Sequence, residues 1–430
     1  MKKLVLLVFA ILAIVYSCEK DPAPKTGDVT PTMARDSLYQ IMQEWYYWYD
    51  LMPVVTRENF TDPYKLMDAM RYNIDRWSFV ADYDEFVAEM QGEFVGHGFR
   101  IGVDDGGKAR IALIYKNSPL YANGVRRGWI VKTINGVNIA PLLLSGNTAA
   151  YRAAIGASQA GITNVFVFTK PDGSDVSIAS TKSTFTVNTV LLSDTLHLSS
   201  GVTGHLVFES FINPSRNELA TAFAFFKQHN IKDLILDMRY NGGGYLDIAQ
   251  TLASYIGGDR LAGTAFSTLQ YNNKQLEENS TFPFKTTAYS LQLPRLVVIT
   301  TRGTASASEA VMNGLKPHVN VVSIGDTTNG KPTGMNGWEI GEKYFMWPVT
   351  FKIVNSQNNG DYYEGIAPAK VVPDDITYDF NDRREANLRE AIHYLETGSV
   401  SSAKSFVKFK NGPQLSEKPA WMNNTFLRLN

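Results

Sequence analysis

The feature that most constrains the fold is a regular alternation of short apolar runs with amphipathic stretches between residues 204 and 324. The apolar runs have the length of buried strands, and the stretches between them carry apolar residues at helical spacing. Strands are predicted at 204–211, 233–238, 296–300 and 319–324, and helices at 218–229, 247–256 and 309–315. This alternation predicts an α/β domain built on a central mixed sheet that is partly parallel.

Two regions of different character precede this domain, so the chain is predicted to be an α/β multidomain protein. Residues 33–90 carry apolar and aromatic side chains at helical spacing, which predicts an N-terminal helical domain. Residues 93–183 hold short alternating runs broken by turn residues, which predicts a small β-rich domain. The α/β domain then covers 184–400, and the polar residues 401–430 form a C-terminal tail.

The first 18 residues predict export and attachment to a membrane. Two lysines precede an apolar run, and Ser17 stands directly before Cys18. The run is shorter than the about 20 residues of a spanning helix, so residues 1–17 are predicted to be a signal peptide. A small residue before a cysteine is typical of a bacterial lipoprotein signal. It predicts lipidation of Cys18 and a location at a bacterial envelope membrane, on the periplasmic side or the cell surface. An ordinary signal peptide with an incidental cysteine is the alternative.

Composition narrows the partners and the chemistry. Residues 18–32 are polar and contain prolines, which favours a tether between the anchor and the folded part. The chain has 41 basic and 42 acidic residues, which argues against a nucleic-acid partner. Cys18 is the single cysteine, so no intrachain disulfide can form. No H-E-x-x-H motif or other metal-ligand spacing occurs, so neither a metal nor a cofactor is predicted.

A serine between a predicted strand and a predicted helix is the first candidate for chemistry. The run Thr304-Ala305-Ser306-Ala307-Ser308-Glu309 contains small residues that permit a tight turn. A hydroxyl at that turn lies near a helix N-terminus, where backbone N–H groups favour developing negative charge. Ser306 and Glu309 also have the spacing of a helix capping box, which explains both residues without catalysis. These interpretations remain open on this segment alone.

Two further segments hold residues that can support acyl transfer. Lys331 follows the predicted strand 319–324, and a lysine at such a position can serve as a base if burial lowers its pKa toward neutrality. Gly242-Gly243-Gly244 follows the strand 233–238, and such glycines can aim backbone N–H groups at a ligand. The alternatives are a surface lysine and a plain tight turn. The G-x-G-x-x-G and P-loop spacings are both absent.

Together these segments resemble the C-terminal processing, or tail-specific, serine peptidases. That family carries a Ser-Ala-Ser-Ala-Ser-Glu run and a Gly-Lys about 25 residues later, which Ser306 and Lys331 match. The resemblance implies a peptidase with Ser306 as nucleophile and Lys331 as general base. It also implies oxyanion donors at the backbone N–H of Ala307 and of Gly243 or Gly244. Thr328 matches a threonine three residues before the family's lysine, and Glu309 is interpreted as a cap and positioner.

The β-rich region resembles a PDZ domain, which extends the resemblance over about residues 75–400. Gly96-His97-Gly98-Phe99 is similar to the PDZ carboxylate-binding loop. Asn117–Val125, Gly128–Val131 and Asn135-Gly136 are similar to the segments that follow it in such domains. The resemblance implies that this loop holds the free C-terminus of a protein or peptide substrate, which adds a strand to the sheet edge.

Two departures from the family pattern keep other functions open. Pro332 replaces the glycine usual after the lysine, and Pro317 stands where some members have an aspartate. A catalytically dead, lipid-anchored binding protein on a peptidase fold is therefore the first alternative. A carbohydrate-binding surface lipoprotein, suggested by the anchor and the aromatic residues, is the second. The oligomeric state does not follow from the sequence.

Overall fold

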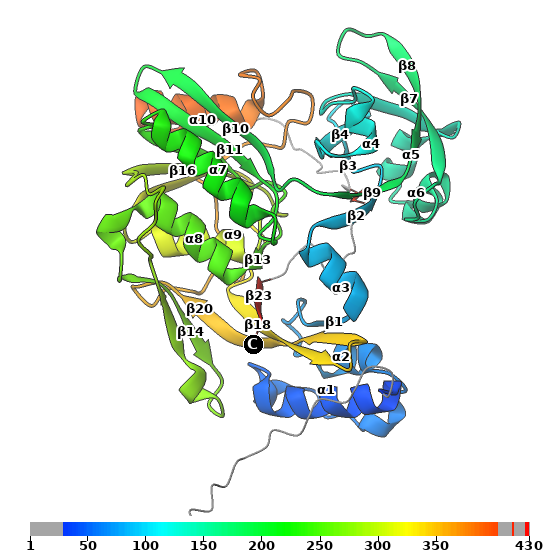
Figure 1. Cartoon of the computed structure of the whole chain (residues 1–430), viewed down its shortest axis with the longest axis vertical. Coiled ribbons are helices and arrows are strands. Elements are labelled where there is room, and N and C mark those ends of the chain that lie inside the picture. The colour runs from blue at the N-terminus through cyan, green and yellow to red at the C-terminus, as the bar shows by residue number, and fades with distance from the viewer. Residues whose placement is uncertain (1–28, 403–414, 417–425, 430) are drawn as a thin grey trace, which may run out of the picture.

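A computed structural model describes residues 29–402, 415–416 and 426–429. Cys18, the predicted signal peptide, most of the predicted tether and most of the predicted tail lie outside these described residues. Figure 1 shows a β-rich domain at the upper right, helices α1 and α2 at the bottom, and the α/β part on the left. The predicted α/β class with an N-terminal helical segment is confirmed. Within the described ranges, no helix combines the length and apolar character needed to cross a membrane.

A six-stranded mixed sheet forms the core of the α/β part. Its strands run in the order β10–β11–β12–β16–β17–β21; β10 and β11 are antiparallel, and the later pairs are parallel. Successive residues of β12 face opposite sides, so Leu234 and Leu236 join one core and Ile235 joins another. Helix α10 covers the Ile235 side, and α7, α8 and α9 pack on the other. The bounds are β10 Val190–Leu198, β11 Gly201–Phe208, β12 Asp233–Asp237, β16 Arg295–Thr300, β17 Asn320–Gly325, β21 Lys370–Val371, α7 Ser215–Gln228, α8 Leu246–Gly257, α9 Ala307–Leu315 and α10 Ala386–Thr397.

A second, antiparallel sheet, which lies below the first in Figure 1, was not predicted from the sequence. Its order is β1–β19–β18–β20–β14–β15, so a strand from the N-terminal region completes a sheet made from residues 265–354. Strand β18 also pairs with β23, and β23 pairs with β13. The bounds are β1 Phe79–Asp82, β13 Gly244–Tyr245, β14 Ala265–Tyr271, β15 Ser280–Pro283, β18 Thr333–Ile340, β19 Tyr344–Trp347, β20 Val349–Val354 and β23 Phe426–Leu429.

The N-terminal helical segment begins earlier than predicted. Helix α1 starts at Pro31, inside the range predicted as tether, because Thr30 accepts a hydrogen bond from the Met33 N–H and proline suits the first helical turn. Buried side chains of α1 and α2 join the large core of the α/β part. The bounds are α1 Pro31–Trp45, α2 Pro63–Met70, α3 Tyr83–Met90, and the 3₁₀ turns Tyr49–Leu51, Arg57–Asn59, Asp259–Leu261 and Leu276–Glu278.

The β-rich domain has its own core and its own sheet. The order is β22–β3–β4–β5–β7–β8, with β6 paired to β5. The short ribbon of β2 and β9 leads into and out of the domain. The bounds are β2 Glu93–Gly96, β3 Phe99–Val103, β4 Ala109–Ile114, β5 Ile130–Ile134, β6 Val137–Asn138, β7 Thr163–Thr169, β8 Asp175–Thr181, β9 Ser183–Thr186, β22 Leu415–Ser416, α4 Pro119–Ala122, α5 Ile139–Leu144 and α6 Thr148–Ile155.

Candidate active site

Ser306 lies in a strained turn between β16 and α9. Its φ is 60° and its ψ is −113°, a combination that L-residues with a side chain seldom adopt. The side chain is buried, and its Oγ has no hydrogen-bond partner in the described part of the chain. The Ser306 N–H donates to Glu309 Oε2 at 2.8 Å, as in a capping box. A serine kept only as a cap would use its hydroxyl, so the idle Oγ favours a reactive role.

Lys331 is a buried residue rather than a surface lysine. It follows β17 and precedes β18, and its side chain is fully enclosed. Burial lowers its pKa to about 7, against smaller opposing effects of Asp75 and Glu309. Its Nζ lies 3.8 Å from Met335 Sδ. A lysine with this pKa is substantially neutral near pH 7, which is the form that a general base requires.

The Glu309 carboxylate brings the serine segment and the lysine segment together. Its Oε2 accepts the Ser306 N–H at 2.8 Å and the Lys331 N–H at 2.9 Å, so one oxygen holds both backbones. Its Oε1 accepts the Thr328 hydroxyl at 2.5 Å and the Gly330 N–H at 2.6 Å. Burial raises the pKa of Glu309, and these donors oppose the rise. Glu309 therefore ties two parallel-strand loops into one unit, and Thr328 takes part through that carboxylate.

The glycine turn lies between Phe211 and strand β23. The Gly243 N–H already donates to Asn241 Oδ1 at 2.9 Å. The Gly243 carbonyl and the Tyr245 N–H are both bonded to Phe211, while Gly244 is paired on its other side with Phe426 of β23. The geometry therefore favours Gly244 over Gly243 as a donor. Ala307 is the first residue of α9, where a helix leaves its N–H groups without an intrahelical acceptor.

The N-terminal segment docks on the lysine loop, a contact that sequence reasoning missed. Arg76 donates to the Asn329 carbonyl at 2.7 Å, and Trp77 Nε1 donates to Asn329 Oδ1 at 3.4 Å. Asp75 is buried, accepts hydrogen bonds from Tyr46 and Ser78, and lies close enough to Lys331 to raise that residue's pKa. The separation of about 250 residues left no local signal for this contact in the sequence.

The loop predicted to bind a carboxylate holds its histidine inside the β-rich domain. His97 Nδ1 lies 3.0 Å from Ser180 Oγ and Nε2 lies 2.7 Å from Asn164 Oδ1, so the ring is occupied internally. Burial lowers its pKa to about 4, which keeps it neutral at pH 7. Phe99 is part of the domain's core. Any carboxylate at this loop must therefore be held by the backbone of Gly96–Phe99 rather than by an imidazolium.

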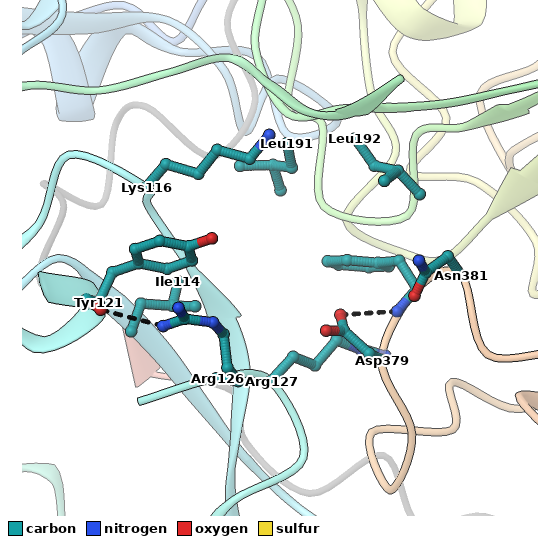
Figure 2. Close-up of a pocket in the computed structure, with 10 residues that line it drawn as sticks. Ile114, Lys116, Tyr121, Arg126, Arg127, Leu191, Leu192, Asp379 and Asn381 are labelled. Atoms are coloured by element: carbon teal, nitrogen blue, oxygen red, sulfur yellow. Dashed lines mark hydrogen bonds between the residues drawn. The ribbon is translucent and has the colours of Figure 1, made fainter. Parts of the chain in front are cut away.

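A separate pocket lies where the β-rich domain meets the α/β part. Figure 2 shows it between Tyr121 and Arg126 on one side and Leu192 and Asn381 on the other. Its volume is about 280 Å³, and none of the predicted catalytic residues lines it. No group of His, Cys, Asp or Glu among residues 29–402 and the two short C-terminal strands is arranged to hold a metal ion. The predicted lipidation site, Cys18, lies outside the described residues.

Similarity to known proteins agrees with this arrangement. A model of "Peptidase family S41" matches residues 202–372, and one of the "Peptidase S41 N-terminal domain" matches 34–79. The carboxy-terminal processing protease CtpB of Bacillus subtilis is 25% identical over 285 residues, covering 66% of this chain and 56% of CtpB. CtpA of the same organism is 26% identical over 323 residues, covering 72% of this chain and 64% of CtpA. The chain thus spans less than two thirds of either relative.

A solved structure from Bacteroides fragilis, named "Putative S41 protease", has the same fold. Its TM-score is 0.70 at 21% identity, and the alignment covers 84% of this chain and 96% of that one. The two family matches include both the loop that holds Asp75 and the segments that hold Ser306 and Lys331. Residues 34–79 and 202–372 of the chain therefore match models of peptidase family S41.

Proposed function

We propose that this chain hydrolyses peptide bonds in proteins with a Ser306/Lys331 dyad. The observation that carries the proposal is the single Glu309 oxygen that binds the backbone N–H groups of both residues. It holds the backbones of the proposed nucleophile and the proposed base beside each other, which supports a dyad that is positioned before substrate arrives. The unpartnered Ser306 Oγ and the lowered pKa of Lys331 supply the matching chemistry.

The proposed reaction passes through an acyl-enzyme. Neutral Lys331 takes the proton from Ser306 Oγ as the oxygen attacks the substrate carbonyl. The resulting oxyanion is held by the N–H groups of Ala307 and Gly244. The Lys331 ammonium then gives its proton to the departing amine, and a water molecule activated by Lys331 releases the acyl group. Glu309 and Thr328 act as positioning residues in this scheme, because they touch backbone and each other rather than substrate.

Substrate choice is proposed to depend on the β-rich domain acting as a PDZ domain. A peptide would add a strand along β3 with its free C-terminal carboxylate at the Gly96–Phe99 backbone. Support comes from the position of β3: on the side away from β4, the two-residue strand β22 is the only described strand paired with it. Attachment through acylated Cys18 is proposed as the means that keeps the enzyme at a bacterial envelope membrane. Loss of detergent-phase partitioning in Cys18→Ala would test that part.

The decisive test compares Ser306→Ala with the wild type on an unfolded protein substrate. Wild type is expected to produce fragments, and Ser306→Ala is expected to lose at least about a thousandfold in kcat. Ser267→Ala is the matched control, because Ser267 is also a buried serine whose Oγ has no partner among the described residues. Equal cleavage by Ser306→Ala would rule out the dyad. No cleavage by the folded wild type would favour the non-catalytic binding protein.

A further inference from the structure

Two short strands of the C-terminal segment occupy the two places where the proposed function puts a peptide. Strand β22 extends the sheet of the β-rich domain beside β3, and β23 lies between β13 and β18. Figure 1 shows β23 at the centre of the molecule, beside β18. One segment of this chain therefore touches both the proposed recognition edge and the proposed catalytic cleft.

Strand β23 sits against the residues that the mechanism uses. Phe426 is paired with Gly244, the favoured oxyanion donor. Leu427 is paired on one side with Tyr245 and on the other with Met335. Met335 is the residue whose sulfur contacts Lys331 Nζ. The backbone of 426–429 thus fills the gap between the glycine turn and the strand that follows the lysine, where a substrate backbone must approach.

Strand β22 has the direction of a peptide ligand at a sheet edge. It runs antiparallel to β3, with Leu415 opposite Ile101 and Ser416 opposite Arg100. The chain therefore approaches the Gly96–Phe99 loop as its residue numbers increase. In a substrate whose C-terminus is held at this loop, the residues that enter the catalytic cleft come earlier in the sequence than the residues that pair with β3. In this chain the order is reversed, because β23 in the proposed cleft follows β22 at the sheet edge.

We propose that strands β22 and β23 are two parts of a tethered ligand, β22 at the recognition edge and β23 in the catalytic cleft, and that substrate must displace them. This inference rests on the proposed function, because that function defines the recognition edge and the catalytic cleft. The reversed order of the two contacts argues that the segment blocks the cleft without being cut in the way a substrate is. Because a tether raises the local concentration of a ligand to the millimolar range, even weak pairing suffices to compete with substrate.

A binding experiment tests occupancy without requiring catalysis. In a Ser306→Ala background, a fluorescent peptide of residues 411–430 is titrated into the full chain and into a variant lacking residues 403–430. The truncated protein is expected to bind the peptide at least about tenfold more tightly, because its two sites are vacant. Equal affinity for the two proteins, or no binding to either, would overturn the proposal.

A kinetic experiment tests the consequence for turnover. The truncated variant and Leu427→Pro are expected to raise kcat/KM for a peptide substrate about tenfold or more, since proline removes the N–H of a residue paired on both sides. The matched control is Ser402→Pro, at an exposed residue outside any strand, which should behave like wild type. Thermal unfolding checks that Leu427→Pro remains folded.

Failure of the two proposals gives different results. If wild type and both variants are inactive but the truncated protein binds the peptide more tightly, the proposed peptidase activity fails and the tethered ligand stands. If all proteins are active at the same rate, the tethered ligand fails. Mass spectrometry that finds the wild-type segment cut between residues 416 and 429 would make it a substrate and overturn the blocking role.

Discussion

At the scale of single residues, the Lys331 ammonium sets the pH range in which the proposed enzyme works. Burial lowers its pKa to about 7, and only the neutral amine can accept the Ser306 proton. We therefore expect kcat/KM to rise with pH through about 7 and to level off above it, with about a tenfold loss one pH unit below the pKa. A pH profile on a substrate without titratable groups measures this limb. A flat profile from about pH 5.5 to about pH 8.5 would exclude Lys331 as the base.

The same buried amine should cost the folded state stability. The pKa of Lys331 is about 7 in the folded chain and 10.5 when the lysine is exposed to water, so the unfolded chain binds more protons between these values. Its contribution therefore makes the fold more stable as pH rises from about 7 to about 10.5. Lys331→Met keeps the volume and removes the charge, and is expected to raise the free energy of unfolding at pH 7 by roughly 2–5 kcal/mol. Urea unfolding of both proteins at pH 7 and at about pH 10 measures this difference in free energy. An equal increase at the two pH values would show that the buried charge of Lys331 is not its cause.

At the scale of elements, the glycine turn after β12 is set by close approach of two backbones. Gly244 has a φ of +137°, and a Cβ added there would lie 2.2 Å from the Phe211 carbonyl oxygen. Gly244→Ala is expected to move the turn and to lower kcat about a hundredfold or more, the loss typical of one oxyanion donor. Gly173→Ala is the control, since Gly173 also has a positive φ (+84°) but open space around it. Similar losses in both variants would show a general folding defect.

The loop before β1 places a second carboxylate near the lysine. Asp75 raises the pKa of Lys331 through its negative charge, against the larger effect of burial. Asp75→Asn removes that charge, so the rising limb of the pH profile should move to lower pH while its plateau changes little. Asp68→Asn is the matched control on the same domain, because Asp68 is exposed and pairs with Arg71. An unchanged limb in Asp75→Asn would separate this loop from the chemistry.

The sequence predicted the elements whose signals are local, and it missed those that depend on distant residues. The strands and helices of the central sheet were predicted because their apolar residues repeat at fixed spacing within a short window. The second sheet was missed because β18 buries polar residues that are satisfied by partners far along the chain. Asn336, for example, accepts hydrogen bonds from Tyr271 and Thr350 through Oδ1. Such a strand lacks the alternation of apolar and polar residues from which a strand is predicted.

The same distinction between local and distant signals separates the candidate-site residues that were predicted from those that were missed. Ser306, Lys331 and Glu309 were identified because each stands in a short motif. Asp75 and the Asn329 contacts were not, since they join segments about 250 residues apart. The sequence could not decide whether Gly243 or Gly244 is the oxyanion donor, because that choice depends on a single hydrogen bond from the Gly243 N–H to the Asn241 side chain.

At the scale of the whole molecule, a buried ionic network joins the β-rich domain to the glycine turn. Arg127 donates to Tyr240 Oη at 2.7 Å and pairs with Asp374 at 3.2 Å. Tyr240 donates to Asp374 at 2.5 Å, and Arg239 pairs with the same carboxylate at 2.9 Å. All of these groups are enclosed, so removing one of the charged side chains would leave an uncompensated buried charge, which is strongly destabilising. The β-rich domain is therefore fixed beside the turn that carries Gly244.

This fixed domain should select substrates by their free carboxylate. Because His97 is held internally and neutral, the Gly96–Phe99 loop can offer only backbone N–H groups to a carboxylate. A peptide with a C-terminal carboxylate should therefore bind more tightly than the same peptide amidated, by about tenfold, since hydrogen bonds to a charged group are the stronger ones. The variant lacking residues 403–430, in the Ser306→Ala background, is the protein to use, because β22 lies along β3 in the full chain. Fluorescence anisotropy gives both affinities. Equal affinities would mean that the β-rich domain recognises internal segments, as its pairing with β22 already does within the chain.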